Sequence, residues 1–311
     1  MTLNAQNPFL KPGRFWRGNL HTHSTRSDGV LPPRDVAQHY RDRGYDFLVL
    51  SDHFVGEYGY PITDLGNDPV DGLTMILGAE MHSGAMENGE IWHLVAVGLP
   101  ADFTPSNSPD FEPRADQEAA HALARRARDA GAFVIIAHPE TSQLTLGDAL
   151  SVDAAHAVEI YNHSAALDRD RGSGLHIAEA LLNHGRRLSL TASDDAHFDI
   201  PDACGGWVMV KAEDNNPDQI VAALKEGHFY ASTGPEIHAV SWGATAVEIE
   251  TSPVRAVALQ GQGSEAVTVH GEDLTSVGLP YGALSSSPWL RLTAIADDRG
   301  RAWTTPVWAS T

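Results

Sequence analysis

Helical runs alternate with short apolar runs along most of the chain. Four runs rich in alanine, arginine and glutamate each end at a glycine, and a β-branched or aromatic run begins two or three residues later. Glycine readily adopts the left-handed conformation that ends a helix. The pattern predicts helices at residues 35–43, 117–130, 175–184 and 217–226, ended by Gly44, Gly131, Gly185 and Gly227, with strands at 47–50, 133–136, 188–190 and 229–230.

Further strand-like runs occupy residues 74–77, 91–97, 157–161 and 207–210. Helices that alternate with short apolar strands are typical of βα units around a parallel sheet or barrel. The sequence therefore predicts an α/β fold. In an α/β barrel the functional site lies at the carboxyl ends of the strands. Polar residues at those ends are therefore the candidate site residues.

The pattern changes after Gly234 and Pro235. Residues 247–250, 254–259, 267–269 and 290–295 alternate or run apolar, without a helical period, and Gly, Ser and Pro separate them. Residues 297–300 are typical of a hairpin turn. We expect one unit at residues 1–235 and a small antiparallel β-sandwich-like module at 236–311. Residues 56–71 and 102–116 are expected to be loops near the site, the second over its mouth.

Composition narrows the classes of partner. The chain has 311 residues, a formal net charge of −20 and a single cysteine, Cys204. Such a negative surface repels nucleic acid and anionic membranes, so we expect a small-molecule substrate and neither of those partners. One cysteine forms no internal disulfide, and residues 1–17 lack the pattern of a signal peptide, so a cytoplasmic location is expected. Nothing in the sequence indicates an oligomeric state.

The first candidate for chemistry is the pair His21 and His23, which follows the first apolar run. Alternate side chains of an extended strand share one face, so both imidazoles project together and could bind a metal. Asp195 and His197 repeat this spacing after another apolar run. Other metal-ligating residue types follow or end strand-like runs between them, at His53, Glu80, His93 and His138. These positions predict a metal site assembled from several strand ends.

The ordered set of motifs resembles the PHP (polymerase and histidinol phosphatase) superfamily. It comprises His21-Thr22-His23-Ser24, Ser27-Asp28-Gly29, Ser51-Asp52-His53, Gly78-Ala79-Glu80, His138-Pro139 and Ser193-Asp194-Asp195-Ala196-His197. The resemblance covers residue 15 to about residue 234. It implies a distorted seven-stranded βα barrel that binds two to three divalent ions. Residues 228–235 and the β tail resemble a branch that includes metal-dependent carbamate hydrolases.

Carried over position by position, the resemblance implies three metal sites. The first would use His21, His23, Glu80 and Asp195; the second Glu80, His93 and His138; the third Asp28, His53 and His197. Glu80 would bridge two ions. Glu80, Asp195 and His197 are the residues we expect to be central to catalysis. Imidazole and carboxylate ligands suit Zn²⁺, Mn²⁺ or Fe²⁺.

Several assignments have competitors. His82 shares the strand face of Glu80 and competes with His93, which we prefer. Asp194 competes with Asp195, which we prefer because it shares a strand face with His197. Arg26, Asn162 and His163 are candidate substrate contacts, with an exposed loop arginine as the alternative for Arg26.

The function expected from these residues is hydrolysis of a small phosphate ester by a metal-activated water. The first alternative is a metal-dependent carbamate or carboxylic ester hydrolase on the same site. A second alternative is a PHP-like module that binds without catalysis. An amidohydrolase-type barrel also opens with His-x-His, but it commonly bridges its metals with a modified lysine. None of Lys11, Lys211 and Lys225 ends a central strand, so we expect Glu80 to bridge.

Overall fold

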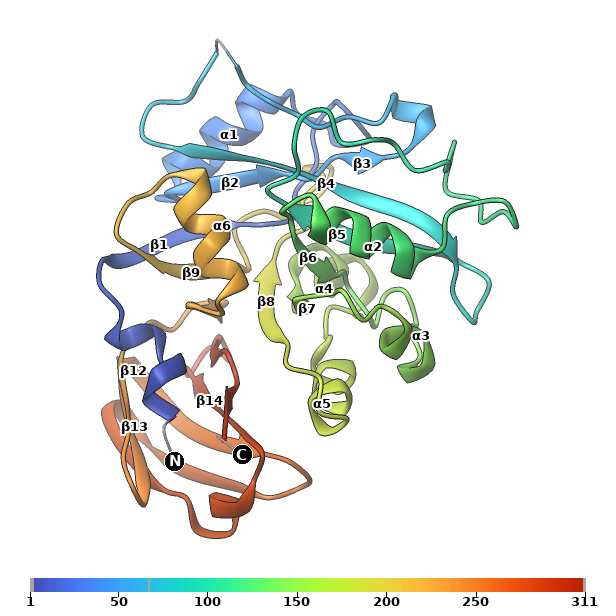
Figure 1. Cartoon of the computed structure of the whole chain (residues 1–311). Coiled ribbons are helices and arrows are strands. Elements are labelled where there is room, and N and C mark those ends of the chain that lie inside the picture. Colours follow the sequence, from blue (N-terminus) through green and yellow to red (C-terminus); the bar gives the residue numbers. More distant parts are fainter. Residues whose placement is uncertain (1–2, 67, 310–311) are drawn as a thin grey trace.

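The computed structural model describes residues 3–66 and 68–309. The chain forms a mixed α/β fold around one extended sheet, with helices packed on its outer side (Figure 1). The strands of the first part are β1 (Arg14–Asn19), β2 (Phe47–Leu50), β3 (His53–Phe54), β4 (Thr74–Ala85), β5 (Ile91–Val97), β6 (Phe133–Ile136), β7 (Ala157–Asn162), β8 (Ser189–Ser193), β9 (Trp207–Ala212) and β10 (Phe229–Ser232). The predicted α/β class is confirmed.

The predicted alternation of helix, glycine and strand is present in all four copies. The corresponding helices are α1 (Pro33–Asp42), α2 (Ala120–Asp129), α5 (Leu175–Asn183) and α6 (Pro217–Lys225). The glycines that follow them have φ angles of 77°, 104°, 81° and 70°. A side chain is disfavoured in this region, which explains why glycine ends each helix. Two short helices, α3 (Leu146–Ser151) and α4 (His163–Arg169), had no clear pattern in the sequence.

The sheet is mixed and open instead of a parallel closed barrel. Its path in this part is β10-β9-β1-β2-β4-β5-β6-β7-β8. The pairs β1–β2, β2–β4, β6–β7 and β7–β8 are parallel, whereas β4–β5, β5–β6, β1–β9 and β9–β10 are antiparallel. Strands β8 and β9 contact each other, but no ladder joins them in the described residues. The structure therefore does not show the closed seven-stranded barrel expected from the sequence.

The last part of the chain is antiparallel, as its alternating pattern predicts. It contains β11 (Ile237–Trp242), β12 (Ala246–Gly261), β13 (Ala266–Pro280), β14 (Trp289–Ile295), β15 (Arg301–Thr304) and β16 (Val307–Trp308). Strand β15 pairs with β10, so these strands continue the first sheet. The boundary at residue 235 therefore falls within a continuous hydrogen-bonded network, and a separate unit at 236–311 stays a prediction.

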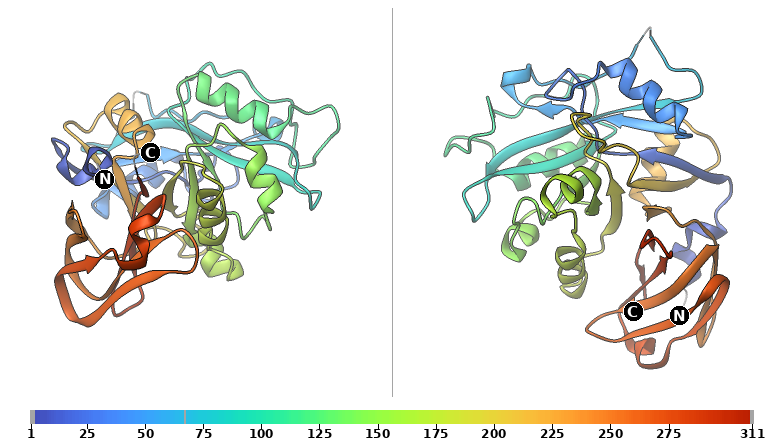
Figure 2. Two further views of the ribbon diagram at one scale, coloured as in Figure 1. Left: turned by 60° about the horizontal axis from the view of Figure 1, so that its bottom comes forward. Right: turned by 180° about the vertical axis from the view of Figure 1, so that it is seen from behind.

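The hydrophobic core follows the two parts of the sheet. All four residues of β2 and of β6 are buried, with α2 and α6 packed nearby. A second core lies within the C-terminal strands and also takes in Leu3 and Tyr230. The described ends of the chain lie beside these strands (Figure 2). None of the described helices has the length and apolarity required to cross a membrane.

Two loops expected near the site lie against each other. The backbone N–H groups of Gly56 and Glu57 donate to the carbonyls of Ser108 and Pro109. These contacts place Tyr58 and Phe111 close together, with ring centroids 6.3 Å apart. Both rings also approach His53, at 6.4 Å and 4.9 Å.

Candidate metal centre

The two motifs with alternate ligand positions lie side by side. The segment 21–23 follows β1, and the segment 195–197 follows β8. The N–H of His23 donates to the carbonyl of Ala196, and the N–H of Asp195 donates to the carbonyl of His21. Their alternate side chains therefore project to a common face. His21 Nε2 and His23 Nε2 lie 3.0 Å and 2.9 Å from the same oxygen, Asp195 Oδ1.

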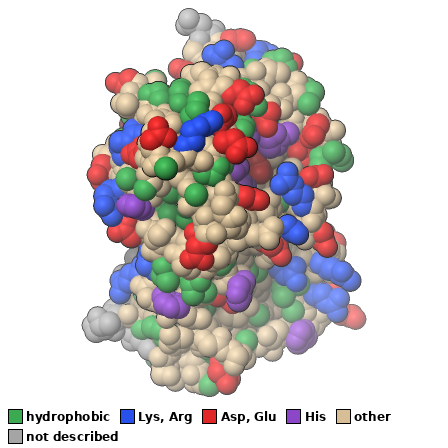
Figure 3. Space-filling view, turned by 90° about the vertical axis from the view of Figure 1, so that its right-hand side faces the viewer, with side chains coloured by type: hydrophobic (Ala, Val, Ile, Leu, Met, Phe, Trp, Pro, Cys, Tyr) green, Lys and Arg blue, Asp and Glu red, His purple; other side chains and the backbone are tan. Residues whose placement is uncertain are grey.

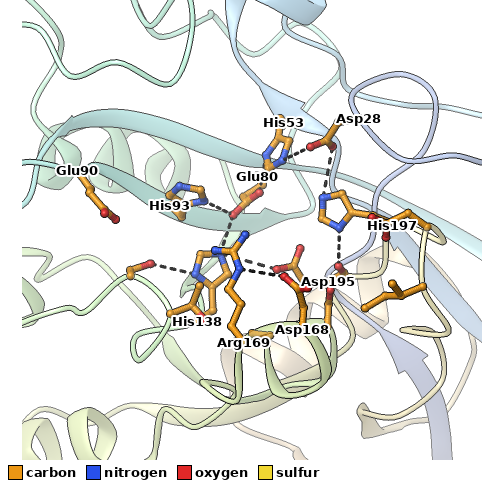
Figure 4. Close-up of a pocket in the computed structure, with 16 residues that line it drawn as sticks. Asp28, His53, Glu80, Glu90, His93, His138, Asp168, Arg169, Asp195 and His197 are labelled. Carbon is orange, nitrogen blue, oxygen red and sulfur yellow. Dashed lines mark hydrogen bonds and ion pairs between the residues drawn. The ribbon is translucent and has the colours of Figure 1, made fainter.

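Glu80 lies at the centre of the cluster and is fully buried. Its two oxygens face different histidines. Oε1 lies 2.8 Å from His93 Nδ1 and 3.1 Å from His138 Nε2. Oε2 lies 2.6 Å from His53 Nδ1 and 3.6 Å from His23 Nε2. Figure 4 shows His53, His93 and His138 reaching toward Glu80 from separate strands and loops. A carboxylate in this position could bridge two cations.

Three overlapping groups of donor atoms result. In each group the ligand atoms lie within 4.8 Å of one another. The first donor group is His21, His23, Glu80 and Asp195; the second is Glu80, His93 and His138; the third is His23, Asp28, His53 and His197. The structure thus brings together all nine residues that the resemblance assigns to metals. It also brings His82 to the cluster, in a further triad with His53 and Glu80.

Two buried atoms of the cluster lack hydrogen-bond partners among the described residues. They are His21 Nε2 and Glu80 Oε2, although each has an oppositely charged neighbour at 3.0 Å or less. A short distance without hydrogen-bond geometry, as between His21 Nε2 and Asp195 Oδ1, is expected when two ligand atoms point at a common cation. Nitrogen and carboxylate donors of this kind suit Zn²⁺, Mn²⁺ or Fe²⁺. The residues therefore fit the divalent ions that the sequence predicts.

The far ring nitrogen of several histidines has a partner of its own. His21 Nδ1 lies 3.1 Å from Glu159 Oε1, and His138 Nδ1 lies 3.0 Å from Ser142 Oγ. His197 Nδ1 lies 2.8 Å from the carbonyl oxygen of Asp195. Such contacts fix the tautomer and the ring orientation, and leave the other nitrogen free to bind an ion.

Two of the candidate ligand positions have unusual backbone conformations. His138 and Asp195 have φ angles of 25° and 57°, which disfavour any residue with a Cβ atom. Such conformations cost free energy and cluster at functional sites. Here each follows the end of a strand, β6 or β8, and turns its side chain toward Glu80.

Burial and close charges shift the pKa values in the cluster. Burial lowers the pKa of His23 to about 4, with His53 and His197 adding to the effect. Burial also opposes protonation of His53, but Glu80 and Asp28 outweigh it and raise its pKa to about 10. Despite burial, the surrounding histidines hold the pKa of Glu80 well below its usual range. Glu80 is therefore an ionised acceptor for cations.

The cluster forms the floor of a cavity of about 330 Å³. Its wall adds residues that the sequence did not indicate: Glu90, Thr141, Ser142, Ser164, Ala165, Asp168, Arg169, Asp199 and Ile200. Arg169, in the last turn of α4, is the one Lys or Arg among the described residues that line it, and its Nε lies 3.3 Å from Asp168. Histidines lie beside acidic side chains on the face shown in Figure 3.

The structure separates the competing aspartates. Asp195 faces His21 and His23, whereas Asp194 accepts hydrogen bonds from Tyr40, Asn19 and the backbone N–H groups of residues 204–206. Asp194 therefore holds the turn after the site. His93 faces Glu80 at 2.8 Å, while His82 is 3.7 Å from it and contacts His53 instead.

The three candidate substrate contacts do not line the cavity above the cluster. Arg26 is exposed and is not among the residues that line the cavity. Asn162 is buried, caps α4 and donates a hydrogen bond to Asp195 Oδ2 at 3.1 Å. His163 lies 3.0 Å from the Tyr161 hydroxyl and lines a different cavity. Asn162 thus holds the side chain of Asp195, a candidate ligand.

Comparisons with known proteins give a fold and no sequence match. No family model and no curated protein sequence matches the chain. A solved structure from Bacteroides vulgatus, a two-domain protein containing a predicted PHP-like metal-dependent phosphoesterase, is 18% identical. The match covers 95% of this chain and 97% of that one, at a TM-score of 0.51.

Two shorter structures are more distant, each at a TM-score of 0.44 and covering 60% of this chain. One is a proposed metal-dependent phosphoesterase from Bifidobacterium adolescentis, 15% identical with 90% of it covered. The other is an amidohydrolase from Chromobacterium violaceum with bound sulfate and no metal, 16% identical with 89% covered. They add nothing to the first match, which extends over nearly the whole chain. The protein therefore shares the overall fold of the Bacteroides vulgatus protein.

Proposed function

We propose that the protein is a metal-dependent hydrolase that acts on a small phosphate ester. The observation that carries the proposal is the position of Glu80, whose two oxygens face different histidines within three overlapping donor groups. The Bacteroides vulgatus protein of the same fold is described as containing a predicted metal-dependent phosphoesterase, which agrees with this function.

The residues of the chain have separable roles in this proposal. Divalent ions bound to the donor groups would activate water and neutralise phosphate oxygens. Glu159 and Ser142 hold His21 and His138 in the orientation that binds an ion. Asn162 holds Asp195 in the same way. The guanidinium of Arg169 faces the cavity and would pair with an anionic group of the substrate.

A second candidate keeps the cluster and changes the bond that is broken. Tyr58 and Phe111 lie beside His53, and their rings would favour an aromatic leaving group. The substrate would then be an aryl carbamate or a carboxylic ester. This alternative agrees with the resemblance of the β tail to the branch that includes carbamate hydrolases. The net positive charge of bound ions and the presence of Arg169 favour phosphate over these neutral esters.

The test compares substrates on protein loaded with Mn²⁺, Zn²⁺ or Fe²⁺. We expect turnover of p-nitrophenyl phosphate, competitive inhibition by inorganic phosphate, and loss of activity on chelation. Turnover of an aryl carbamate alone, without inhibition by phosphate, would support the second candidate. Ion binding without turnover of any ester would support a module that binds without catalysis.

Glu80→Ala tests the site itself. Because Glu80 contacts donors of more than one group, the variant should lose bound ions and activity together while it keeps its fold, which depends mainly on apolar burial. Glu248→Ala is the matched control, because Glu248 is exposed on β12. Ion content and circular dichroism are measured on both. Near-native turnover of Glu80→Ala would show that Glu80 is not the bridging ligand.

A further inference from the structure

One buried histidine of the cluster belongs to none of the three donor groups. His82 lies in β4 on the same face as Glu80, and it is fully buried. Its Nε2 lies 2.9 Å from His53 Nδ1, but 3.7 Å from the nearest oxygen of Glu80. Its ring also packs edge-on against His93 and Phe111, with centroids 4.3 Å and 5.0 Å apart.

The direction of the contact with His53 follows from its surroundings. His53 Nδ1 lies 2.6 Å from Glu80 Oε2. A lone pair on that nitrogen would face the lone pairs of an ionised carboxylate, so the nitrogen carries a proton. Glu80 Oε2 has no hydrogen-bond partner among the described residues. The N–H of His53 is therefore directed at His82 Nε2, which accepts the hydrogen bond.

This hydrogen bond determines whether the other ring nitrogen of His53, Nε2, can bind an ion. In the neutral ring that binds an ion, a proton on Nδ1 leaves the lone pair on Nε2, which lies 3.3 Å from Asp28 Oδ2. His197 Nε2 lies 3.4 Å from the other oxygen of Asp28. The free nitrogen of His53 thus points into the third donor group.

Other histidines of the cluster have an equivalent partner. Glu159 contacts the far nitrogen of His21, Ser142 that of His138, and the carbonyl of Asp195 that of His197. His82 provides the corresponding acceptor for His53. The arrangement leaves His82 Nδ1 buried with no partner among the described residues, at a cost in free energy.

We propose that His82 is a positioning residue, whose Nε2 fixes the tautomer and orientation of His53 for an ion in the third donor group. The inference rests on the proposed metal-dependent function and adds a role for a residue outside its ligand set. His82 holds the ring without binding the ion itself. Loss of such a partner typically weakens metal binding about 10- to 100-fold.

The test compares His82→Leu, which fills the space without an acceptor, with His82→Gln, whose side-chain oxygen can accept from His53. Ions per chain are counted by elemental analysis, and Zn²⁺ alone is titrated into stripped protein by calorimetry. We expect His82→Leu to bind one ion about 10- to 100-fold more weakly and the others as in the wild type. His82→Gln should recover most of this loss. His121→Leu, on the exposed face of α2, is the control and should bind all ions normally.

Several outcomes would overturn the inference. Wild-type affinity for every ion in His82→Leu would show that His53 needs no acceptor. Equal losses in His82→Leu and His82→Gln would assign His82 a different role, as would a wild-type protein that binds no third ion. If His82→Leu does not fold, His82→Asn replaces it, because its shorter amide cannot reach His53. A wild type that binds three ions but hydrolyses no phosphate ester would contradict the proposed function and leave this inference standing.

Discussion

Arg169 is the side chain at which the proposed preference for an anionic substrate can be tested. Among the described residues that line the cavity, it is the one Lys or Arg, beside several carboxylates. The side chains of Arg169 and its partner Asp168 are similarly exposed, so solvent screens their ion pair. The guanidinium is therefore available to bind a substrate. An anionic substrate would use this charge in addition to the bound ions.

Arg169→Met should therefore raise KM for a phosphate ester about tenfold, with a smaller change in kcat, because a charge-assisted hydrogen bond is lost. The inhibition constant of inorganic phosphate should rise in parallel. Arg169→Lys keeps the positive charge but lacks the planar guanidinium, so its KM and inhibition constant should lie between those of the wild type and of Arg169→Met. Steady-state kinetics at fixed ionic strength measures both constants. Unchanged values in Arg169→Met would show that the arginine does not contact the substrate.

A histidine outside the cluster makes the protein sensitive to acid. Burial, with Arg128 and Lys225 nearby, lowers the pKa of His156 from 6.5 to about 4. Its Nδ1 accepts a hydrogen bond from the Val134 N–H at 3.0 Å, which protonation would break. The unfolded chain binds this proton at higher pH than the folded protein does. The contribution of His156 to stability is therefore present above about pH 6.5 and falls as the pH decreases toward 4.

His156→Gln should remove this part of the pH dependence. The difference in unfolding free energy between wild type and variant should shift in favour of the variant as the pH falls from 7 to about 4.5. Urea unfolding at each pH measures it. His238→Gln, at an exposed histidine of β11, provides the control for the generic effect of the substitution. A pH-independent difference for His156→Gln would contradict the prediction.

At the scale of elements, the glycines that end helices are the strongest local determinants of the fold. Gly44 has a φ of 77° and open space around its Cα, so an added Cβ would meet only a conformational penalty. Gly278 in β13 also has open space, but its φ is not positive. Because neither position is crowded, a comparison of the two measures the effect of backbone conformation without an effect of packing.

Gly44→Ala should destabilise the protein by about 1–2 kcal/mol, because the left-handed conformation disfavours a Cβ atom. Gly278→Ala should be neutral or slightly stabilising, since alanine suits an extended backbone better than glycine. Chemical denaturation of the two variants gives the comparison. Equal effects would show that the conformation after α1 is not what requires glycine.

The elements that carry the site were predicted unequally well. The strands 47–50, 91–97 and 133–136 were predicted at the bounds that the structure shows, because short buried strands have continuous apolar runs. By contrast, β4 continues to Ala85, so Glu80 lies within a strand and not at its end. Helix α4 has a polar sequence, and its capping by Asn162 became evident only from the hydrogen bond to the Ala165 N–H.

At the scale of the whole molecule, the two parts of the chain share their cores. Trp303 of β15 is buried in the core formed by the first part, and Tyr230 of β10 is buried in the core of the last strands. The pairing of β10 with β15 joins the two. The first part therefore depends on residues beyond the predicted boundary.

We expect a fragment of residues 1–235 to unfold without the cooperativity of the full chain, because it exposes the edge of β10 and the cavity left by Trp303. Circular dichroism and thermal melting of the fragment and the full chain are compared. A fragment that melts cooperatively and binds the same number of ions would instead establish an independent unit at 1–235.

The sequence by itself determined the alternation of helices and strands, the change of pattern near residue 235, and the residue types of the cluster. These properties are local, because they depend on periodicity, on glycine and on the chemistry of side chains at strand ends. Only the tertiary structure decided that the sheet is open and mixed, that Asp194 faces away from the cluster while Asp195 faces His21, and that His82 contacts His53. Strand direction and side-chain contacts between distant segments depend on how those segments pack, and spacing along the chain does not encode them.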